Sequence, residues 1–215
     1  MARKKSSSNQ YPCMVLCNGT SKRFGSNKML ADLVGKPLLM HTIENIMPYV
    51  SDLALNGELD AEYDVFNLPV FPDAITERLG KLGPLAGVLT AMEWAKELGY
   101  VRVLTLSGDA PFVPDDWAEK LSQTPDDIIA IPNVDGQNHQ ICGLWPVALA
   151  SDLRLFLQAG ESYRVKDFLA VHRMQIVAFH KQGVIDPFFN VNTREDMKVA
   201  EQILAARDGH MARGA

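Results

Sequence analysis

A loop that combines glycines, hydroxyl groups and cations follows the first apolar run of the chain, at residues 16–28. Gly19 and Gly25 can adopt backbone conformations that bring amide N–H groups close to an anion. Arg23 and Lys28 carry positive charge that would neutralise such an anion. The loop therefore predicts a phosphate-binding site, and the alternative is a polar turn that follows a buried strand.

Two well-known phosphate loops are excluded by spacing. The loop of nucleotide triphosphatases requires a lysine directly after its second glycine, where this chain has Ser26. The dinucleotide-binding pattern G-x-G-x-x-G also has no match in residues 16–28.

A single acidic residue, Asp109, lies just past an apolar run, residues 100–106, that is typical of a buried parallel strand. Mg²⁺ commonly binds one or two carboxylates together with the phosphates of a substrate. Asp109 is therefore a candidate magnesium ligand beside the phosphate loop. The alternative, that Asp109 only opens the turn at Pro111, is equally open, because aspartate often begins such turns.

Two asparagines, Asn190 and Asn192, lie ahead of the last expected helix. Their side chains offer both hydrogen-bond donors and acceptors, so they could bind a heterocycle or a phosphate. The residue order also suits capping and turn formation, which we favour for these two side chains when they are considered alone. Thr193 is the expected N-cap of the helix.

Two further side chains with reactive groups show no catalytic pattern. His139 has no obvious orienting partner in the sequence and is interpreted as a hydrogen-bonded histidine within a strand. Cys17 is interpreted as a small residue of the loop rather than as a nucleophile. No spacing of the Ser-His-Asp or Cys-His type stands out in the chain.

The composition limits the class of protein. A chain of 215 residues with 26 acidic and 21 basic side chains has a net charge of −5, which argues against a general nucleic-acid binder. The three cysteines form no C-x-x-C pair, as expected of reduced thiols in a cytoplasmic protein. No apolar run has the length of a membrane span. We expect one domain over residues 11–207, with flexible tails at residues 1–10 and 208–215.

Helices and strands alternate along the chain. Strands are expected at residues 13–16, 52–56, 68–71, 100–106, 127–131, 139–145 and 175–179. Helices are expected after Pro37, across the stripe from Leu85 to Ala95, at residues 148–158 and 163–171, and from Thr193 onward. Such repeated βαβ units predict a three-layer α/β fold with a mostly parallel sheet, whose ligands bind beyond the carboxyl ends of the strands. The residues expected at that edge are the 16–28 loop, Asn56, Asp73, Asp109, Asn190 and Asn192.

Together, these motifs resemble those of the molybdenum cofactor guanylyltransferase family, within the nucleotidyltransferase superfamily. The family opens with L-A-G-G-x-S-x-R-M-G-x-D-K, to which residues 16–28 align without a gap. Further similar motifs are Gly35-Lys36-Pro37-Leu38, Gly83-Pro84-Leu85-Ala86-Gly87, Gly108-Asp109-Ala110-Pro111-Phe112-Val113-Pro114 and Asn190-Val191-Asn192-Thr193-Arg194-Glu195-Asp196.

The resemblance implies a cytoplasmic enzyme with an α/β/α, Rossmann-like sheet of the nucleotide-diphospho-sugar-transferase type. Such an enzyme joins GMP from Mg²⁺-bound GTP to the molybdopterin cofactor and releases pyrophosphate, with no protein nucleophile. Its implied partners are GTP, the molybdopterin cofactor, and the molybdoenzymes that accept the cofactor or their chaperones, with no nucleic acid and no membrane.

The resemblance also implies roles for individual positions. Leu16, Cys17, Asn18, Gly19 and Lys28 match residues that contact GTP, Asn56 and Asp73 match those that hold the nucleoside, and Asp109 matches the Mg²⁺ ligand. Arg164, Asn190 and Asn192 match residues on the pterin side. The expected catalytic residues are Lys28, Arg23 and Asp109, which align the substrates and neutralise developing charge.

Three of the positions that depart from the family pattern matter for function. Cys17 and Asn18 replace Ala-Gly, so that a side chain stands where a glycine backbone should approach the nucleotide. Asn27 replaces the aspartate before Lys28 and removes a charge. Related cytidylyltransferases, which resemble the chain less closely, carry alanine at the position of Asn18 where the guanylyltransferase family has glycine. The identity of the nucleotide base is therefore left open by this position. The alternatives are therefore a nucleotidyltransferase that uses CTP or a different phosphorylated acceptor, and a non-catalytic protein that binds a nucleotide or cofactor.

Overall fold

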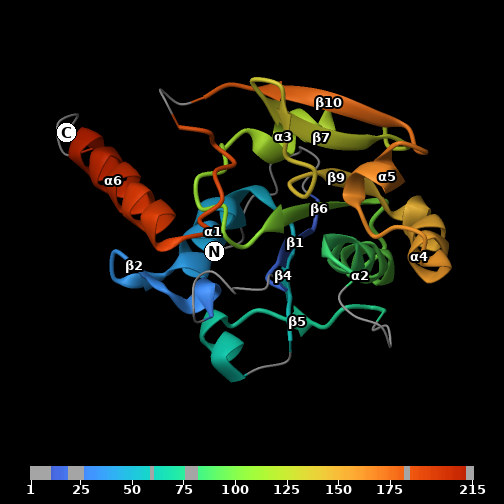
Figure 1. Ribbon diagram of the computed structural model, residues 1–215, viewed down its shortest axis with the longest axis horizontal. Helices are drawn as coiled ribbons and strands as arrows, with labels where there is room; N and C mark the ends of the chain where they lie inside the picture. The colour runs from blue at the N-terminus through green and yellow to red at the C-terminus, as the bar shows by residue number, and fades with distance from the viewer. Residues whose placement is uncertain (1–10, 19–26, 59–60, 76–81, 182–184, 212–215) are drawn as a thin grey trace, which may run out of the picture.

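The structure is a computed structural model that describes residues 11–18, 27–58, 61–75, 82–181 and 185–211. Within these residues the main sheet has eight strands. They are β1 (Cys13–Leu16), β4 (Leu53–Asn56), β5 (Val70–Phe71), β6 (Arg102–Ser107), β7 (Ile129–Val134), β8 (Gln137–Asn138), β9 (Leu144–Pro146) and β10 (Met174–Phe179). Their order is β10-β7-β9-β6-β1-β4-β5, with β8 beside β7 (Figure 1). Only β8 and β9 pair antiparallel to their neighbours among these described strands, so the predicted α/β fold with a mostly parallel sheet is confirmed.

Helices and short turns connect the strands. The α-helices are α1 (Leu38–Ile46), α2 (Pro84–Glu97), α3 (Trp117–Ser122), α4 (Ala150–Ala159), α5 (Val165–Leu169) and α6 (Arg194–Met211). The 3₁₀ turns are η1 (Lys28–Leu30), η2 (Met47–Tyr49), η3 (Ala61–Phe66) and η4 (Val147–Leu149). A hairpin of β2 (Asp32–Leu33) and β3 (Lys36–Pro37) precedes α1. None of the helices in the described ranges combines the length and the apolar character that crossing a membrane requires.

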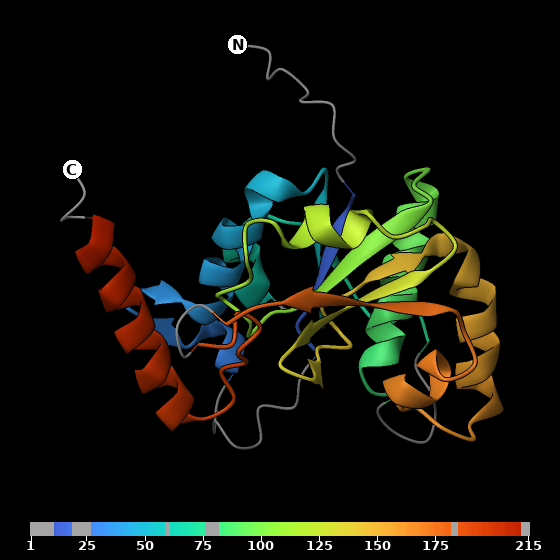
Figure 2. The ribbon, with the colours of Figure 1, turned by 90° about the horizontal axis from the view of Figure 1, so that it is seen from above.

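The helices cover both faces of the sheet, as strand β1 illustrates. Cys13 and Val15 belong to a core that includes residues of α1 and α3, whereas Met14 and Leu16 belong to a second core with α2 and α4. All four side chains are buried, as expected when a parallel strand is covered on both faces. A third, smaller cluster holds α6 against Phe112 and the β2–β3 hairpin. Figure 2 shows α6, in red, at the opposite end of the molecule from α4.

The strand expected at residues 139–145 is wrong. β9 begins only at Leu144, and the chain before it folds as a turn. In this turn the amide of Cys142 donates to the carbonyl of His139 (3.0 Å), and the carbonyl of Cys142 accepts from Nε1 of Trp117 (2.8 Å). The turn and a core side chain thus satisfy backbone groups that a strand would have offered to its neighbour.

Most other expected elements lie close to their predicted positions. β1 has its predicted bounds, and α6 begins directly after Thr193. The hydroxyl of Thr193 accepts from the amide of Asp196 (3.1 Å), while the Asp196 carboxylate accepts from the amide of Thr193 (2.8 Å), which is a reciprocal N-terminal cap. α6 continues to Met211, inside the segment for which a flexible tail is expected. The β2–β3 hairpin and α3 have no counterpart among the expected elements, because they are too short to show a period.

A fully buried arginine joins β6 to the turn between α3 and β7. Arg102, the first residue of β6, is 0% exposed. Its Nη1 donates to the carbonyl of Thr124 (2.9 Å), and its Nη2 donates to the Thr124 hydroxyl (2.5 Å) and to the carbonyl of Ile128 (3.4 Å). The guanidinium also lies 5.6 Å from the ring centroid of Tyr11. One side chain therefore supplies the donors for several acceptors of this turn.

We expect Arg102→Met to lower the free energy of unfolding by about 1–3 kcal/mol, because the buried acceptors of Thr124 then lose their donor. Arg154→Met is the matched control, since Arg154 forms a partly exposed ion pair with Glu93 of a kind worth about 0–1 kcal/mol. Urea unfolding of both variants measures the difference. An equal fall in the free energy of unfolding for both variants would contradict the expectation that the buried hydrogen bonds of Arg102 stabilise the fold more than the partly exposed ion pair of Arg154 does.

Candidate functional site

The carboxyl ends of three neighbouring strands meet at one edge of the sheet. The parallel register places Leu16, the last residue of β1, beside Asn56 of β4 and Ser107 of β6. The segments that leave β1 and β6 then carry Asn18 and Asp109. Residues that are far apart in the sequence are therefore brought to one edge by strand pairing alone.

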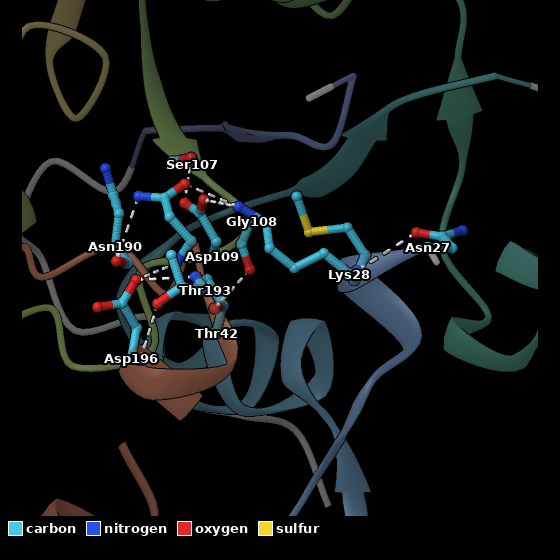
Figure 3. A network of polar contacts seen from close by, with 11 residues as sticks. Asn27, Lys28, Thr42, Ser107, Gly108, Asp109, Asn190, Thr193 and Asp196 are labelled. Atoms are coloured by element: carbon cyan, nitrogen blue, oxygen red, sulfur yellow. Dashed lines mark hydrogen bonds and ion pairs between the residues drawn. The ribbon is translucent and has the colours of Figure 1, made fainter. Parts of the chain in front are cut away.

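A buried ion pair between Lys28 and Asp109 lies at this edge. Nζ of Lys28 is 2.5 Å from Oδ2 of Asp109, and the two side chains are only 9% and 7% exposed. Nζ also donates to Oδ1 of Asn192 (3.0 Å), and Oδ1 of Asp109 accepts from the Ser107 hydroxyl (2.5 Å). Figure 3 shows the Lys28 side chain extending from η1 toward Asp109. The pair joins η1, the end of β6 and the segment before α6.

Hydrogen bonds fix the backbone on both sides of Asp109. The amide of Gly108 donates to the carbonyl of Leu16 (3.0 Å), and the carbonyl of Gly108 accepts from the hydroxyl of Thr42 in α1 (2.9 Å). The carbonyl of Asp109 accepts from the amide of Val191 (2.9 Å). Nothing in the sequence distinguishes Thr42 as a site residue, because a buried threonine in a helix usually serves packing. These bonds hold the Asp109 carboxylate in place.

A second polar cluster contains Asn18, Asn56 and Asp73. Nδ2 of Asn18 donates to Oδ1 of Asp73 (2.9 Å), and Nδ2 of Asn56 donates to the same oxygen (3.0 Å). Asn56 is nearly buried against α2, where a Cβ added to Gly87 would lie 2.4 Å from its Oδ1. Three of the residues predicted to bind the nucleotide are thus in contact, and Gly87 leaves room for the side chain of Asn56.

The two asparagines before α6 differ in their contacts. Oδ1 of Asn192 accepts from Lys28, while Nδ2 of Asn192 donates to the carbonyl of Asn190 (3.3 Å). Capping of α6 is carried out by Thr193 and Asp196 instead. The favoured interpretation, capping and turn formation, is therefore wrong for Asn192 in its capping part, because the carboxamide contacts the ion pair, whereas the bond to Asn190 is a local turn contact.

Asn27, which departs from the family pattern, has two contacts of its own. Its Oδ1 accepts from the amide of Met29 (3.3 Å) and caps η1, and its Nδ2 donates to Oε2 of Glu62 (3.2 Å). An aspartate at this position would place a second carboxylate beside Glu62, which the amide avoids. The substitution leaves the contact between Lys28 and Asp109 intact.

A pocket of about 240 Å³ opens beside Ser107, on the far side of Asp109 from Asn18. It is lined by residues 137–142, Ser107 and Asn190. Of the residues predicted to bind the acceptor, only Asn190 is part of this lining. Spacing and periodicity did not mark Gln137 and Gln140 as site residues, and Gln140 lies in a turn that was expected to be a strand.

His139 lies in the turn beside this pocket and not in a strand as expected. Its Nε2 is 3.1 Å from Oδ2 of Asp186, and its ring centroid is 4.9 Å from that of Phe188. Burial lowers the pKa of His139, and the nearby Asp186 carboxylate opposes that effect only in part. Asp186 was not predicted, because the contact joins distant parts of the chain.

Cys17 is buried directly after β1, and its thiol donates to the carbonyl of Val15 (3.6 Å). Burial raises the pKa of the Cys17 thiol well above its usual value, and the charge of Asp109 adds to this effect. Because the thiolate is the reactive form of cysteine, this thiol is poorly suited to act as a nucleophile. This supports the interpretation of Cys17 as a small residue rather than a nucleophile, and the structure places it in the core.

The remaining candidates are not part of these clusters. The Leu16 side chain is buried against α2, so only its backbone faces the edge of the sheet. Arg164 precedes α5, and no hydrogen bond or ion pair between described residues connects it to Asn190 or Asn192. Gly19 and Arg23 lie outside the described residues, so their assignment to a phosphate loop stays a prediction.

The chain matches a known domain family and similar proteins of known name. Residues 13–176 match the family model described as a MobA-like NTP transferase domain. Proteins called molybdenum cofactor guanylyltransferase include one from Rhizobium leguminosarum bv. trifolii, which is 38% identical over 90% of this chain and 92% of its own length. Another, from Rhizobium rhizogenes, is 39% identical over 92% of this chain and 94% of its own length.

Solved structures share the fold. Molybdopterin-guanine dinucleotide biosynthesis protein A from Archaeoglobus fulgidus superposes with a TM-score of 0.70 at 22% identity, over 91% of this chain and 99% of that one. A nucleotidyl transferase from Methanothermobacter thermautotroptrophicus has a TM-score of 0.68 at 16% identity, over 93% of this chain and 100% of that one.

We expect the free energy of unfolding to fall as the pH is lowered through and below about 6.5, in part because of His139. Its pKa is lower in the folded state, so the unfolded chain takes up a proton first and acid favours unfolding. His139→Gln should flatten this part of the profile, measured by urea unfolding at a series of pH values. His180→Gln, which changes an exposed histidine, is the matched control. Parallel profiles for His139→Gln and the parent would contradict this role.

Proposed function

Because the chain belongs to the molybdenum cofactor guanylyltransferase family and carries a MobA-like NTP transferase domain, we propose that it transfers GMP from GTP to the molybdopterin cofactor. The observation that carries this proposal is the buried pair of Lys28 and Asp109, placed between the cluster around Asp73 and the pocket beside Ser107. The charge of the phosphates would be neutralised at this pair, which lies between the proposed nucleotide region and the proposed acceptor region.

In the proposed reaction, a phosphate oxygen of the acceptor attacks the α-phosphorus of GTP. The new bond joins the two phosphates, and the bond to the β-phosphate breaks, so that pyrophosphate leaves with the electron pair of that bond. The protein aligns the reactants and stabilises charge, and no covalent intermediate with a side chain is needed. Lys28 would contact the phosphates, and we assign the same function to Arg23.

Mg²⁺ fits the donor set at Asp109. Its carboxylate supplies hard oxygen ligands of the kind that Mg²⁺ prefers. No group of three or more metal-binding side chains forms among the described residues, which suits an ion held by one carboxylate and by phosphates. When bound, Mg²⁺ would neutralise charge on the phosphates. Asp109 would hold the ion, and Ser107 would orient the carboxylate through its hydroxyl.

We assign the nucleotide to the part of the edge formed by β1, β4 and β5. Asn18 and Asp73 present amide and carboxylate groups there, and the buried Asn56 holds the Asp73 carboxylate in place. A purine base offers matching donors and acceptors. Leu16, Cys17 and Gly19 would contact the nucleotide through their backbone, as the resemblance implies. We place the reaction in the cytoplasm, which is supported by three buried cysteines that form no disulfide.

The acceptor belongs on the other side of Asp109. Asn190 lines the pocket there, and Asn192 contacts Lys28, so both could bind the acceptor near its phosphate. Arg164 stays a candidate by resemblance only. Molybdoenzymes or their chaperones are the proposed recipients of the finished cofactor.

Lys28→Ala tests the function directly. We expect transfer of GMP from Mg²⁺-bound GTP to molybdopterin to fall by about 10²–10³-fold, the usual effect of removing one preorganised group that stabilises the transition state. The assay measures release of pyrophosphate and formation of the dinucleotide.

Lys96→Ala removes an exposed lysine of α2 and is the matched control. Circular dichroism at the assay temperature checks that both variants are folded, since Lys28→Ala leaves Asp109 buried without its ion pair. Full activity of folded Lys28→Ala would remove this lysine from the reaction, and no transfer by the unmodified protein would contradict the proposed function.

Asn18→Gly tests which base the enzyme prefers. Asp73 loses one of its two amide donors, so we expect the ratio of kcat/KM for GTP to that for CTP to change by up to about tenfold, with Mg²⁺ dependence unchanged. Asn67→Gly, at an exposed position outside the site, is the control. A higher kcat/KM for CTP than for GTP in the unmodified protein would favour the alternative function of a cytidylyltransferase.

A further inference from the structure

The pocket beside Ser107 lies on the opposite side of β6 from the nucleotide residues. Asn18, Asn56 and Asp73 follow or end β1, β4 and β5, which are the strands on one side of β6. Residues 137–142 begin at β8, which pairs with β7, and lead to β9, on the other side. Asp109 follows β6 itself, so the reaction centre separates the two regions.

The polar groups of this pocket are mostly uncharged carboxamides. Gln137, Gln140 and Asn190 each line it, and none of their carboxamides forms a hydrogen bond with another described residue. Asn138 is different, since its Oδ1 accepts from Asn133 (2.5 Å). No Lys, Arg, Asp or Glu is among the described lining residues. Such a lining suits an uncharged polar ring better than a further phosphate group.

The wall of the pocket is held in place by the core. The carbonyl of Ile141 accepts from the Thr105 hydroxyl (2.5 Å), and the carbonyl of Cys142 accepts from Nε1 of Trp117 (2.8 Å). The turn that carries Gln140 is therefore fixed by side chains of β6 and α3. A preformed wall lowers the entropy cost of ordering a binding site.

We propose that Gln137 and Gln140 determine which acceptor is used, by binding the edge of a planar heterocycle of the pterin class. This inference rests on the proposed function. A pterin ring presents N–H donors beside nitrogen and carbonyl acceptors, and a carboxamide offers one group of each kind. Ile141 supplies apolar surface for the face of the ring.

The position of the pocket beside Asp109 also determines where the phosphate end of the acceptor would lie. Ser107 lines the pocket and donates to Oδ1 of Asp109, so the pocket borders the ion pair. An acceptor whose ring contacts Gln140 would therefore extend its phosphate toward Lys28. The same pocket would reject a phosphorylated acceptor that has no hydrogen-bonding ring, because such an acceptor offers no donors or acceptors to the carboxamides of Gln137 and Gln140.

The test uses 6-hydroxymethylpterin monophosphate, a fluorescent pterin with one phosphate, titrated against the full chain without GTP. We expect Gln140→Leu to weaken its binding by about tenfold and the double variant Gln137→Leu/Gln140→Leu to weaken it further. Gln123→Leu removes an exposed glutamine after α3 and is the matched control. In the transfer assay, the KM for molybdopterin should rise in Gln140→Leu while the KM for GTP stays within twofold.

Guanosine serves as a competitor in the same titration, because guanine and pterin share one hydrogen-bonding edge. The proposal expects guanosine not to displace the pterin, since the base belongs on the other side of Asp109. Displacement by guanosine, or pterin binding by Gln140→Leu as tight as by the parent, would overturn it. Pterin binding that depends on Gln140 in a protein without transfer activity would support the pocket and contradict only the proposed function.

Discussion

The candidate site depends on the burial of two opposite charges, those of Lys28 and Asp109. Either charge alone would be strongly unfavourable at this exposure, so each requires the other. A buried ion pair of this kind is weak evidence for stability, because well-packed apolar residues often serve a fold as well. What the pair provides is position: it holds η1, the end of β6 and the segment before α6 at fixed separations.

Strand order then places the residues of the two proposed binding regions on opposite sides of β6. The segment after β6 carries Asp109, and the carboxyl ends of β1, β4 and β5 lead to the cluster around Asp73. On the other side of β6, β8 and the turn that follows it carry Gln137 and Gln140. Because parallel strands all end at the same edge, a phosphate bound at Lys28 is within reach of ligands on both sides. One sheet therefore places the proposed nucleotide and acceptor regions on the two sides of Asp109.

Much of this could be predicted from the sequence where a local pattern carries the information. The bounds of β1, the cap at Thr193 and the sheet type follow from periodicity and capping residues. The turn at residues 139–143 could not, because its apolar residues also suit a strand, and contacts from Trp117 and Thr105 decide between them. The contact of Asn192 with Lys28 was likewise hidden, since capping is a local property and this contact joins distant segments.

The fit between Gly87 and Asn56 limits how related chains can vary. A side chain at position 87 would meet the Asn56 carboxamide at 2.4 Å, a separation at which one of the two must move. Asn56 is itself held by the carbonyl of Phe71 and by Asp73, so it has little freedom to withdraw. A larger residue at position 87 therefore requires a smaller or displaced side chain at position 56, so the packing of α2 against the sheet constrains the residue that we assign to the nucleotide region.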